Sequence, residues 1–270
     1  MKVGLVQMPV TADLQKNLAF ARREILDLAE RGAEIVVLPE MFCCPYDTAR
    51  FAEYAEPMGG ETFCALQSAA RDAGVLLIGG SVPELDHRAV YNTCYVFDRE
   101  EYVTRYRKMH LFDVAIPGGQ NFRESDALAA GDSLAVVQTR FGTIGICICF
   151  DIRFPELARL YALAGVEILF VPAAFNPTTG PAHWELTMRA RALDNQCYVV
   201  ACAPAQDPGA SYVSYGHSVV CSPWGDVVSQ LTERAESRVV ELDLSRIQEV
   251  REGLPLLESR RTDRYELNEI

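Results

Sequence analysis

The chain has 270 residues, a length that suits one α/β domain with a sizeable core. Apolar residues make up 49% of it and charged residues 23%, which excludes an intrinsically disordered chain. The 37 acidic against 25 basic side chains give a net charge of −12, which excludes nucleic acid and anionic membranes as partners, because both bind basic surfaces. An anionic substrate would need a cation placed locally, inside a site.

The nine cysteines are odd in number and form no CxxC pair. Several lie inside apolar runs, which is typical of buried reduced thiols rather than of a disulfide framework or a zinc site. Residues 1–9 predict a strand and not a signal peptide. We therefore expect a cytoplasmic protein without a metal, and a redox role for the vicinal Cys43 and Cys44 stays open.

Short runs rich in Val, Ile and Tyr predict strands, and a 3.6-residue period of apolar residues predicts helices. The expected strands cover 3–9, 34–38, 75–80, 90–97, 102–107, 133–139, 143–149, 167–172, 197–203, 217–222, 226–230 and 237–243. The expected helices cover 14–31, 61–73, 155–164, 182–195 and 244–252. No Pro-, Gly- or Ser-rich linker divides the chain, so we expect a single mixed α/β domain over residues 1–270.

Two segments of the chain are similar to each other. Residues 31–42 (RGAEIVVLPEMF) and 164–175 (AGVEILFVPAAF) share five residues at the same offsets, either through duplication or by chance. Where the second segment has Ala173, the first has Glu40 at the end of an apolar strand. Such a carboxyl group is either solvated in a loop or placed for function, because α/β proteins bind ligands outside the carboxyl ends of their strands.

Cys149 ends the run over 143–149, shortly before a helix that starts near Pro155. We expect a strand, a sharp turn and the positive end of a helix, an arrangement that favours the thiolate. A cysteine nucleophile usually needs a histidine base, and His110 is the candidate for a Cys–His pair. Taken singly, Lys108, His110 and Glu124 are equally typical of ordinary strand-end or loop side chains.

The order of three motifs changes that interpretation. LPE ends at Glu40, YRKMHLFD contains Lys108, and CFDIRFPE begins at Cys149. In this order the motifs resemble the nitrilase superfamily of carbon–nitrogen hydrolases, over nearly the whole chain. Several other segments are similar to its omega-amidase branch: LPEMFCCPY, TTGPAHWEL, RARALDNQ, SYVSYGH and IQEVREGLPLL. Two departures from the pattern are Phe150, where a Tyr is more common, and the Cys pair before Pro45.

The resemblance implies a four-layer αββα sandwich of two pseudo-related halves, assembled as a homodimer or a larger homo-oligomer. It also implies a catalytic set of Glu40, Lys108 and Cys149, assisted by Glu124, with no cofactor. In such a site Cys149 would attack an amide, and Glu40 would act as acid and base, which requires a pKa raised toward neutrality.

The oxyanion would be stabilised by Lys108 and the backbone N–H of Phe150, each donor contributing about 2.7–4 kcal/mol. Glu124 would orient Lys108 and the substrate amide.

The branch implies small dicarboxylate monoamides as substrates, such as α-ketoglutaramate and α-ketosuccinamate. Arg153, four residues after the nucleophile, is the expected anchor of the free carboxylate through a bidentate contact. It could instead pair with Asp151 or Glu156. The further pocket candidates are Tyr46, Phe175 and Thr179.

Other functions stay open at this stage. One is a sister amidase acting on deaminated glutathione, which shares the TGPAHWE-like segment, and others are a nitrilase or a carbamoylase. A Cys–His hydrolase requires that His110 reach Cys149. A catalytically silent ligand-binding or scaffolding member is the alternative outside enzymes, and the presence of all four catalytic side chains argues against it.

Overall fold

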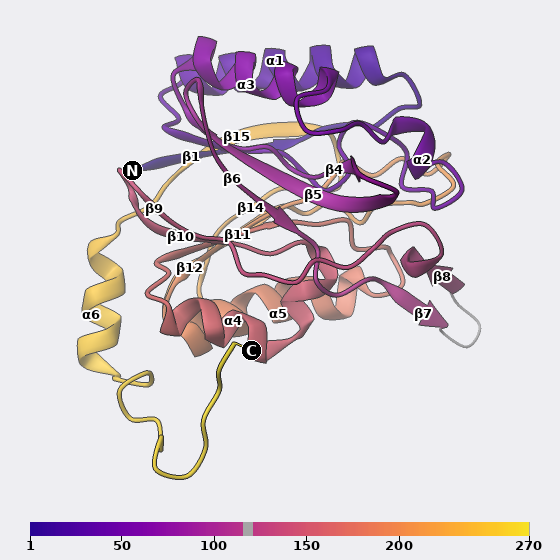
Figure 1. Ribbon diagram of the computed structural model, residues 1–270. Helices are drawn as coiled ribbons and strands as arrows, with labels where there is room; N and C mark the ends of the chain where they lie inside the picture. Colours follow the sequence, from indigo (N-terminus) through magenta and orange to yellow (C-terminus); the bar gives the residue numbers. More distant parts are fainter. Residues whose placement is uncertain (116–120, 270) are drawn as a thin grey trace.

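A computed structural model describes residues 1–115 and 121–269. Two large β-sheets lie face to face, and helices cover both outer sides (Figure 1). Helices α1 (Leu14–Glu30) and α3 (Glu61–Ala73) lie on one outer side, and α4 (Pro155–Leu163) and α5 (Gly180–Asn195) lie on the other. The expected four-layer αββα sandwich is confirmed.

The first sheet has the order β15-β1-β2-β3-β5-β4, and β6 also pairs with β5. Its strands are β1 (Lys2–Gln7), β2 (Ile35–Val37), β3 (Leu76–Ile78), β4 (Val82–Asp86), β5 (Ala89–Asp98), β6 (Glu101–Arg107) and β15 (Glu236–Glu241). Strands β1, β2 and β3 are parallel, so their carboxyl ends meet at one edge of the sheet.

The second sheet has the order β14-β13-β12-β11-β10-β9. Its strands are β9 (Val136–Thr139), β10 (Gly142–Ile146), β11 (Ile168–Pro172), β12 (Tyr198–Cys202), β13 (Val219–Cys221) and β14 (Val227–Gln230). A separate pair joins β7 (Asp113–Ala115) to β8 (Asn121–Arg123). The remaining short elements are α2 (Phe51–Tyr54), the 3₁₀ turns η1 (Glu124–Asp126) and η2 (Cys149–Arg153), and helix α6 (Ser245–Gly253).

The two similar segments of the sequence occupy equivalent places in the two halves. Strand β2 follows α1 and lies parallel between β1 and β3, while β11 follows α4 and lies parallel between β10 and β12. This agrees with two pseudo-related halves. Glu40 and Ala173 therefore follow corresponding strands, one in each half.

Helix α1 shows why the outer layers form where they do. Its apolar side is buried against the first sheet through Leu18, Ala21, Ile25 and Leu28. The carboxylate of Asp13 accepts the N–H of Lys16 at 3.2 Å, a helix cap that typically contributes about 1 kcal/mol.

The close packing of α1 on the sheet also depends on a glycine in β1. A side-chain carbon added at Gly4 would lie 2.9 Å from Leu28, closer than real contacts allow.

A continuous apolar core fills the space between the sheets. It contains Val3 and Leu5 of the first sheet and Ile144, Ile146 and Phe170 of the second, all buried. Since the core is dry and close-packed, an ionisable group at its edge loses its water. None of the helices formed by the described residues is long and apolar enough to cross a lipid bilayer.

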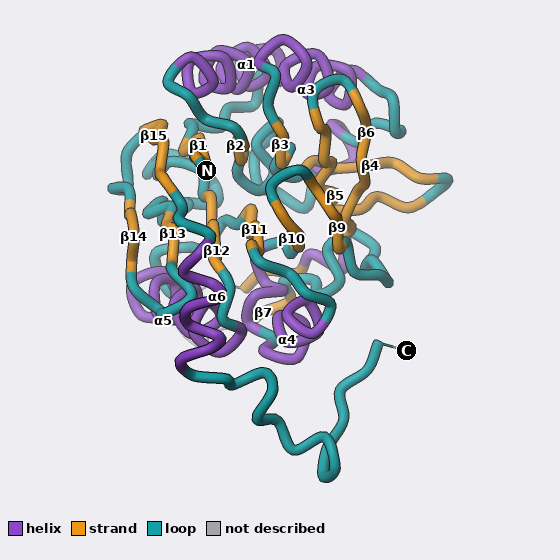
Figure 2. The backbone as a smooth tube through the Cα atoms, turned by 90° about the vertical axis from the view of Figure 1, so that its left-hand side faces the viewer, coloured by secondary structure: helices purple, strands orange, loops and turns teal. Residues whose placement is uncertain are grey.

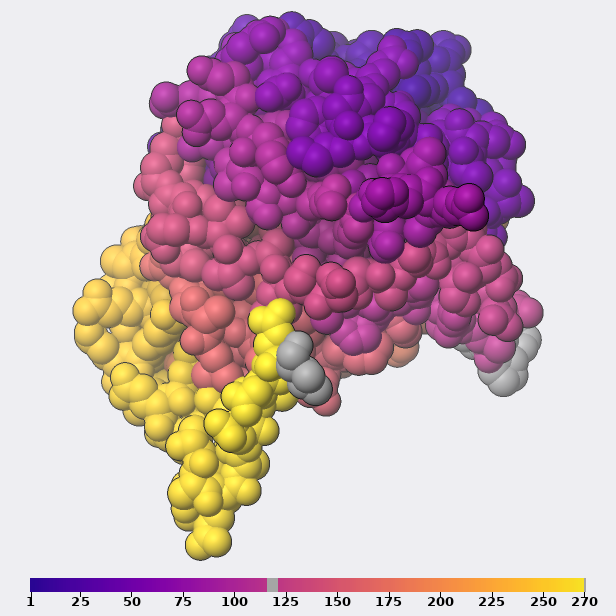
Figure 3. Space-filling model, viewed as in Figure 1, coloured from indigo at the N-terminus to yellow at the C-terminus, as the bar shows by residue number. Residues whose placement is uncertain are grey.

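Helix α6 and the chain beyond it lie outside the sandwich. Figure 2 shows the segment after α6 leaving the body of the molecule and then turning back toward it. In the space-filling view the same segment forms an arm that projects below the second half (Figure 3). The active-site candidates lie elsewhere, at the carboxyl ends of the parallel strands.

Candidate active site

Glu40 lies just beyond the carboxyl end of β2, where the chain makes a sharp turn. Met41 has a left-handed backbone (φ 50°), and its N–H donates to the Ser81 hydroxyl at 3.0 Å. The Glu40 side chain is fully buried. A solvated position for this carboxyl group is therefore wrong.

Lys108 follows β6 and is also fully buried. Its backbone N–H donates to the carbonyl of Asn92 on β5 at 2.9 Å. Its ammonium group donates to Glu40 Oε1 at 2.9 Å and lies 2.8 Å from Glu124 Oε2. Burial lowers the pKa of Lys108, but the two carboxylates outweigh burial and hold it well above its ordinary value. The group is thus a permanent cation.

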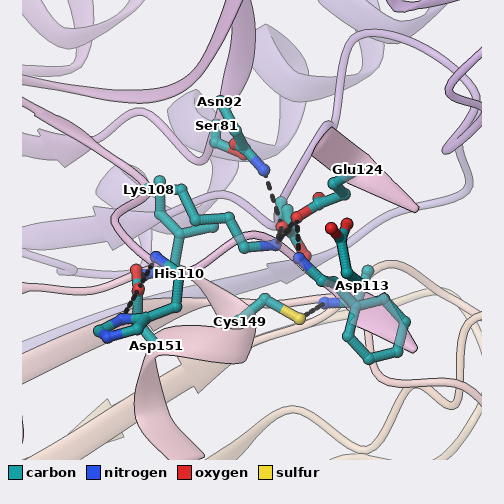
Figure 4. Close-up of polar contacts among 12 residues, drawn as sticks. Ser81, Asn92, Lys108, His110, Asp113, Glu124, Cys149 and Asp151 are labelled. Atoms are coloured by element: carbon teal, nitrogen blue, oxygen red, sulfur yellow. Dashed lines mark hydrogen bonds and ion pairs between the residues drawn. The ribbon is translucent and has the colours of Figure 1, made fainter. Parts of the chain in front are cut away.

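Glu124 opens η1 and completes this buried ion cluster. The backbone N–H of Phe112 donates to its Oε2 at 2.6 Å, and the hydroxyl of Tyr46 donates to its Oε1 at 2.5 Å. Figure 4 shows Lys108 extending toward Glu124, with Asn92 above and Cys149 below in that view. The expected association of Glu40, Lys108 and Glu124 is present in the structure.

Cys149 lies on a turn rather than at the end of a strand. Strand β10 stops at Ile146, and Cys149 begins η2 with a left-handed backbone (φ 49°). Such a conformation costs a non-glycine residue about 1–3 kcal/mol, and it is often found where a side chain is held for function. Its Sγ accepts the backbone N–H of Ala174, which follows β11, at 3.5 Å.

Asp151 holds this turn against the strand that carries Lys108. The buried carboxylate accepts the backbone N–H groups of Ile148 at 3.0 Å and His110 at 2.8 Å. It also accepts the hydroxyl of Tyr106, on β6, at 2.8 Å. The turn that carries Cys149 and the segment that carries Lys108 therefore share one anchor.

The expected resting thiolate at Cys149 is wrong. Burial raises the pKa of the thiol well above its ordinary value, and the Glu40 carboxylate raises it further. Lys108 and the Ala174 N–H act in the opposite direction without reversing this. At rest the residue is a neutral thiol, and it needs a base.

Glu40 has the properties of that base. Burial raises its pKa, Glu124 adds to the effect, and Lys108 partly opposes it. Glu40 and Cys149 each shift the pKa of the other, as neighbouring groups do. The direction agrees with the value near neutrality that acid–base chemistry at this position requires.

His110 does not act as a partner of Cys149 in this geometry. Its Nδ1 pairs with Asp151 Oδ1 at 2.8 Å, and its ring stacks on Phe154 with centroids 3.7 Å apart. In residues 1–115 and 121–269, no hydrogen bond joins the histidine to the sulfur. A Cys–His dyad is therefore not formed.

Arg153 is a half-buried cation close to Cys149. It pairs with neither Asp151 nor Glu156, and no carboxylate lies within ion-pair distance among the described residues. Its guanidinium donates to His183 Nδ1 at 3.1 Å and lies 4.3 Å from the ring centroid of Phe175. Burial lowers the pKa of Arg153, which indicates that its guanidinium group is only partly hydrated.

Two other pocket candidates, Tyr46 and Thr179, lie in different surroundings. Tyr46 belongs to the ion cluster and packs against Tyr212, with ring centroids 4.6 Å apart and the ring planes tilted by 35°. Thr179 precedes α5, is half-buried and bonds to Asn176 Oδ1 at 3.2 Å. No hydrogen bond between Thr179 and Arg153 is found in the part of the chain that the structure describes.

Phe150 lies directly after Cys149, and its ring packs edge-on against Phe112, with centroids 5.2 Å apart. Its backbone N–H makes no hydrogen bond within the described ranges. It is therefore free to donate to a substrate oxygen beside Cys149.

A cavity of about 300 Å³ lies beside the ion cluster, with Glu40, Tyr46 and Tyr212 in its wall. Among the described residues, its ionisable lining includes Asp47, Asp207 and Glu40 against one cation, Arg50. The cavity is thus acidic and poorly suited to an anion. Among the described residues, no group of three or more His, Cys, Asp or Glu side chains is placed to hold a metal ion.

Sequence reasoning missed four residues at this site. Asn92 bonds to Glu40, and Asp151 fixes the turn of Cys149 against β6. Tyr212 and His183 lie beside Tyr46 and Arg153. Tyr212 and His183 fall inside segments that resemble the omega-amidase branch, so a signal was present. Asn92, in the middle of a strand, carried none.

Comparisons with known proteins agree with this geometry. The carbon-nitrogen hydrolase family model matches residues 2–252. Omega-amidase NIT2-A of Xenopus laevis is 47% identical over 99% of this chain and 98% of its own. Omega-amidase NIT2 of Homo sapiens is 43% identical over 98% of this chain and 96% of its own. The solved structure of Nit3 from Saccharomyces cerevisiae, a member of branch 10 of the nitrilase superfamily, is 37% identical, with a TM-score of 0.89 over 97% of this chain and 96% of that one.

Fold, site and relatives define a class of enzyme, a hydrolase that acts on carbon–nitrogen bonds. The chain belongs to the carbon–nitrogen hydrolase family, within the nitrilase superfamily.

Proposed function

We propose that this enzyme is an omega-amidase, which hydrolyses the amide of small dicarboxylate monoamides to the acid and ammonia through a thioester on Cys149. The observation that carries the proposal is the buried Glu40–Lys108–Glu124 cluster next to a cysteine on a strained turn. A structural role would not account for three buried charges beside a buried thiol, because burying such groups is costly.

In the first half of the reaction, Glu40 takes the thiol proton as the sulfur attacks the amide carbon. The oxyanion accepts hydrogen bonds from Lys108 and from the backbone N–H of Phe150. The tetrahedral intermediate collapses, the C–N bond breaks, and Glu40 returns its proton to the departing ammonia. Lys108 is suited to this role because its contact with Tyr46 is long, at 3.4 Å, and can be exchanged for the substrate oxygen.

In the second half, Glu40 takes a proton from water, whose oxygen attacks the thioester. The same donors hold the second oxyanion, the C–S bond breaks, and Glu40 returns the proton to the sulfur. Glu124 keeps Lys108 in place through both halves, since its own oxygens are fixed by Phe112 and Tyr46. Both steps therefore use the same groups in the same positions.

The dicarboxylate preference is supported by Arg153 and by the names of the relatives. Arg153 is an unpaired cation, within the described residues, on the turn that carries the nucleophile, where a bidentate contact could bind a substrate carboxylate. The acidic cavity on the Tyr46 side would repel that carboxylate. We accordingly assign α-ketoglutaramate and α-ketosuccinamate as substrates, with Phe175 and Thr179 near the bound carboxylate.

The experiment that tests this assignment is ammonia release from a panel of amides at equal concentration. The panel contains α-ketoglutaramate, α-ketosuccinamate, deaminated glutathione, glutamine and a simple nitrile. Release from the first two at the highest kcat/KM supports the proposal. A preference for deaminated glutathione would favour the sister amidase, and release from none of the compounds would favour a silent scaffold.

The proposed setting is the cytoplasm. A cysteine nucleophile works only in its reduced form. The nine cysteines are free, and eight of them are buried. These observations support a reducing compartment.

A further inference from the structure

Asn92 lies on β5 with its side chain fully buried. Cys94 and Val96, two and four residues further along, belong to the core between the two sheets, and strand alternation places Asn92 on that same face. Its side-chain Nδ2 donates to Glu40 Oε1 at 2.8 Å, and its backbone carbonyl accepts the backbone N–H of Lys108. One residue thus contacts both members of the buried ion pair.

The two oxygens of Glu40 have very different surroundings. Oε1 receives Lys108 Nζ at 2.9 Å and Asn92 Nδ2 at 2.8 Å, and the Tyr46 hydroxyl lies 3.3 Å away. Oε2 is buried and has no hydrogen-bond partner among the described residues. A buried carboxylate oxygen without a donor is unusual, since such atoms are nearly always paired.

We propose that Asn92 is a positioning residue that occupies Glu40 Oε1 and thereby reserves Oε2 for the proton exchanged with Cys149, ammonia and water. The inference rests on the function proposed above and extends it to a residue outside the catalytic set. A neutral amide suits this role because it cannot be protonated or deprotonated at working pH, so its hydrogen bond persists through the whole cycle. Without Asn92, Oε1 would keep Lys108 and the longer Tyr46 contact, and the carboxylate would be less firmly oriented.

The role has a chemical signature that a purely structural residue would lack. A hydrogen bond to the ionised carboxylate favours that form, so its loss must raise the pKa of Glu40. A change of the Asn92 side chain keeps the backbone carbonyl that holds the Lys108 N–H, so we expect the other groups that face Glu40 to stay in place. They are Tyr46 from the loop after β2, Lys108 after β6, Glu124 on η1, Cys149 on η2 and Tyr212 beyond β12.

The test measures the rate at which iodoacetamide alkylates Cys149 as a function of pH, with the labelled peptide identified by mass spectrometry. Alkylation needs the thiol proton to be removed but needs no amide substrate, so it is independent of the substrate assignment. In the wild type the rate should rise with pH as Glu40 ionises. In Asn92→Leu the pH at which the rate rises should be higher by about one unit, the effect of losing one hydrogen bond to a charged group.

Thr93→Val is the matched control. Thr93 is the next residue of β5, is equally buried, and donates to a different buried carboxylate, Glu84 Oε2, at 2.7 Å. Its loss should destabilise the fold in a similar way and leave the alkylation profile where it is in the wild type. In steady-state assays, Asn92→Leu should lower kcat by about 10- to 100-fold with little change in KM, since it impairs proton transfer rather than binding.

Asn92→Asp provides a second variant of nearly the same volume in case the leucine variant does not fold. Its carboxylate would face Glu40. The rate should again rise at a higher pH than in the wild type, because a like charge disfavours ionisation of Glu40. An unshifted profile in a folded Asn92 variant, or an equal shift in Thr93→Val, would overturn the proposal. A wild type that is never labelled at Cys149 would instead overturn the proposed nucleophile.

Discussion

Four ionisable side chains, Glu40, Lys108, Glu124 and Cys149, lie close together almost without contact with water. One cation between two carboxylates leaves one negative charge uncompensated. Burial therefore favours a proton on Glu40 or on the thiol, and the pKa values of both groups are raised. In the proposed mechanism, that one proton moves between the Glu40 carboxylate and the Cys149 sulfur.

Replacing Glu40 by Gln tests the proposed proton transfer from Cys149 directly. Glu40 must be ionised to accept the thiol proton, and its raised pKa means that kcat/KM falls as the pH decreases through a value above 4.5. Glu40→Gln removes the base and should lower kcat by about 10²–10⁴-fold. Initial rates between pH 5 and 9 measure both effects. Glu34→Gln, at the exposed start of the same segment, should keep the wild-type profile.

Arg153 gives a prediction about recognition. Replacing it by Met should raise KM for α-ketoglutaramate by about 10- to 100-fold, because a charge-assisted contact contributes about 1.5–3 kcal/mol. Arg153→Lys should show a smaller loss, since the fork of donors is gone. Turnover of butyramide, which has no carboxylate, serves as the control and should change little. An unchanged KM for the keto acid amide in both variants would mean that Arg153 is not the anchor.

At the scale of elements, the site depends on η2 being fixed relative to β6. Asp151 makes this connection through Ile148, His110 and Tyr106. The strained backbone of Cys149 is maintained because those hydrogen bonds compensate for it.

Asp151→Asn removes the charge and places an amide nitrogen where an acceptor is needed. We expect the free energy of unfolding to fall by about 1–3 kcal/mol. kcat should decrease more than KM rises, since the nucleophile loses its fixed position. Urea titration and steady-state kinetics measure the two effects. Glu156→Gln, on the exposed first turn of α4, is the control, and equal behaviour of the two variants would contradict the assigned role.

Most regular elements could be predicted from the sequence, because apolar periodicity reflects which face is buried. The hairpin strand β4 was missed because Pro83 lies within it. Proline is tolerated there since β4 is at the end of the sheet order. The strand over 143–149 was predicted three residues too long: the chain leaves the sheet after Ile146, although the residues that follow are as apolar as a strand.

The catalytic residues could be predicted only together, from the order of their motifs. Glu40, Lys108 and Glu124 are far apart in the sequence, and no local pattern shows that they are buried together. The motif order and the resemblance supplied that information. The resting state of Cys149 was predicted wrongly because a helix dipole was weighed without the burial that outweighs it. Asn92 could not be found, because its role depends on which strand face points at Glu40.

At the scale of the whole molecule, the outer face of the second half carries exposed leucines. Leu186 on α5 is 68% exposed, and Leu163 and Leu193 of the same layer are also exposed. Exposed apolar groups on one helical layer are compatible with a contact between copies. We accordingly expect a homodimer or a larger homo-oligomer.

Sedimentation velocity tests this expectation. The wild type should sediment as a dimer or larger species, and Leu186→Glu should shift the distribution toward the 30.0 kDa monomer. Leu85→Glu, on the β4–β5 hairpin, should leave the assembly unchanged. A monomeric wild type, or an unaffected Leu186→Glu variant, would show that this face is not an interface.

The central claim is that amide hydrolysis proceeds through Cys149. The measurement that tests it most directly is the rate of ammonia release from α-ketoglutaramate by the wild type and by Cys149→Ala, at equal concentrations of folded protein. We expect steady release by the wild type and a loss of about 10⁴-fold or more in the variant. Equal release by both proteins, or none by the folded wild type, would contradict it.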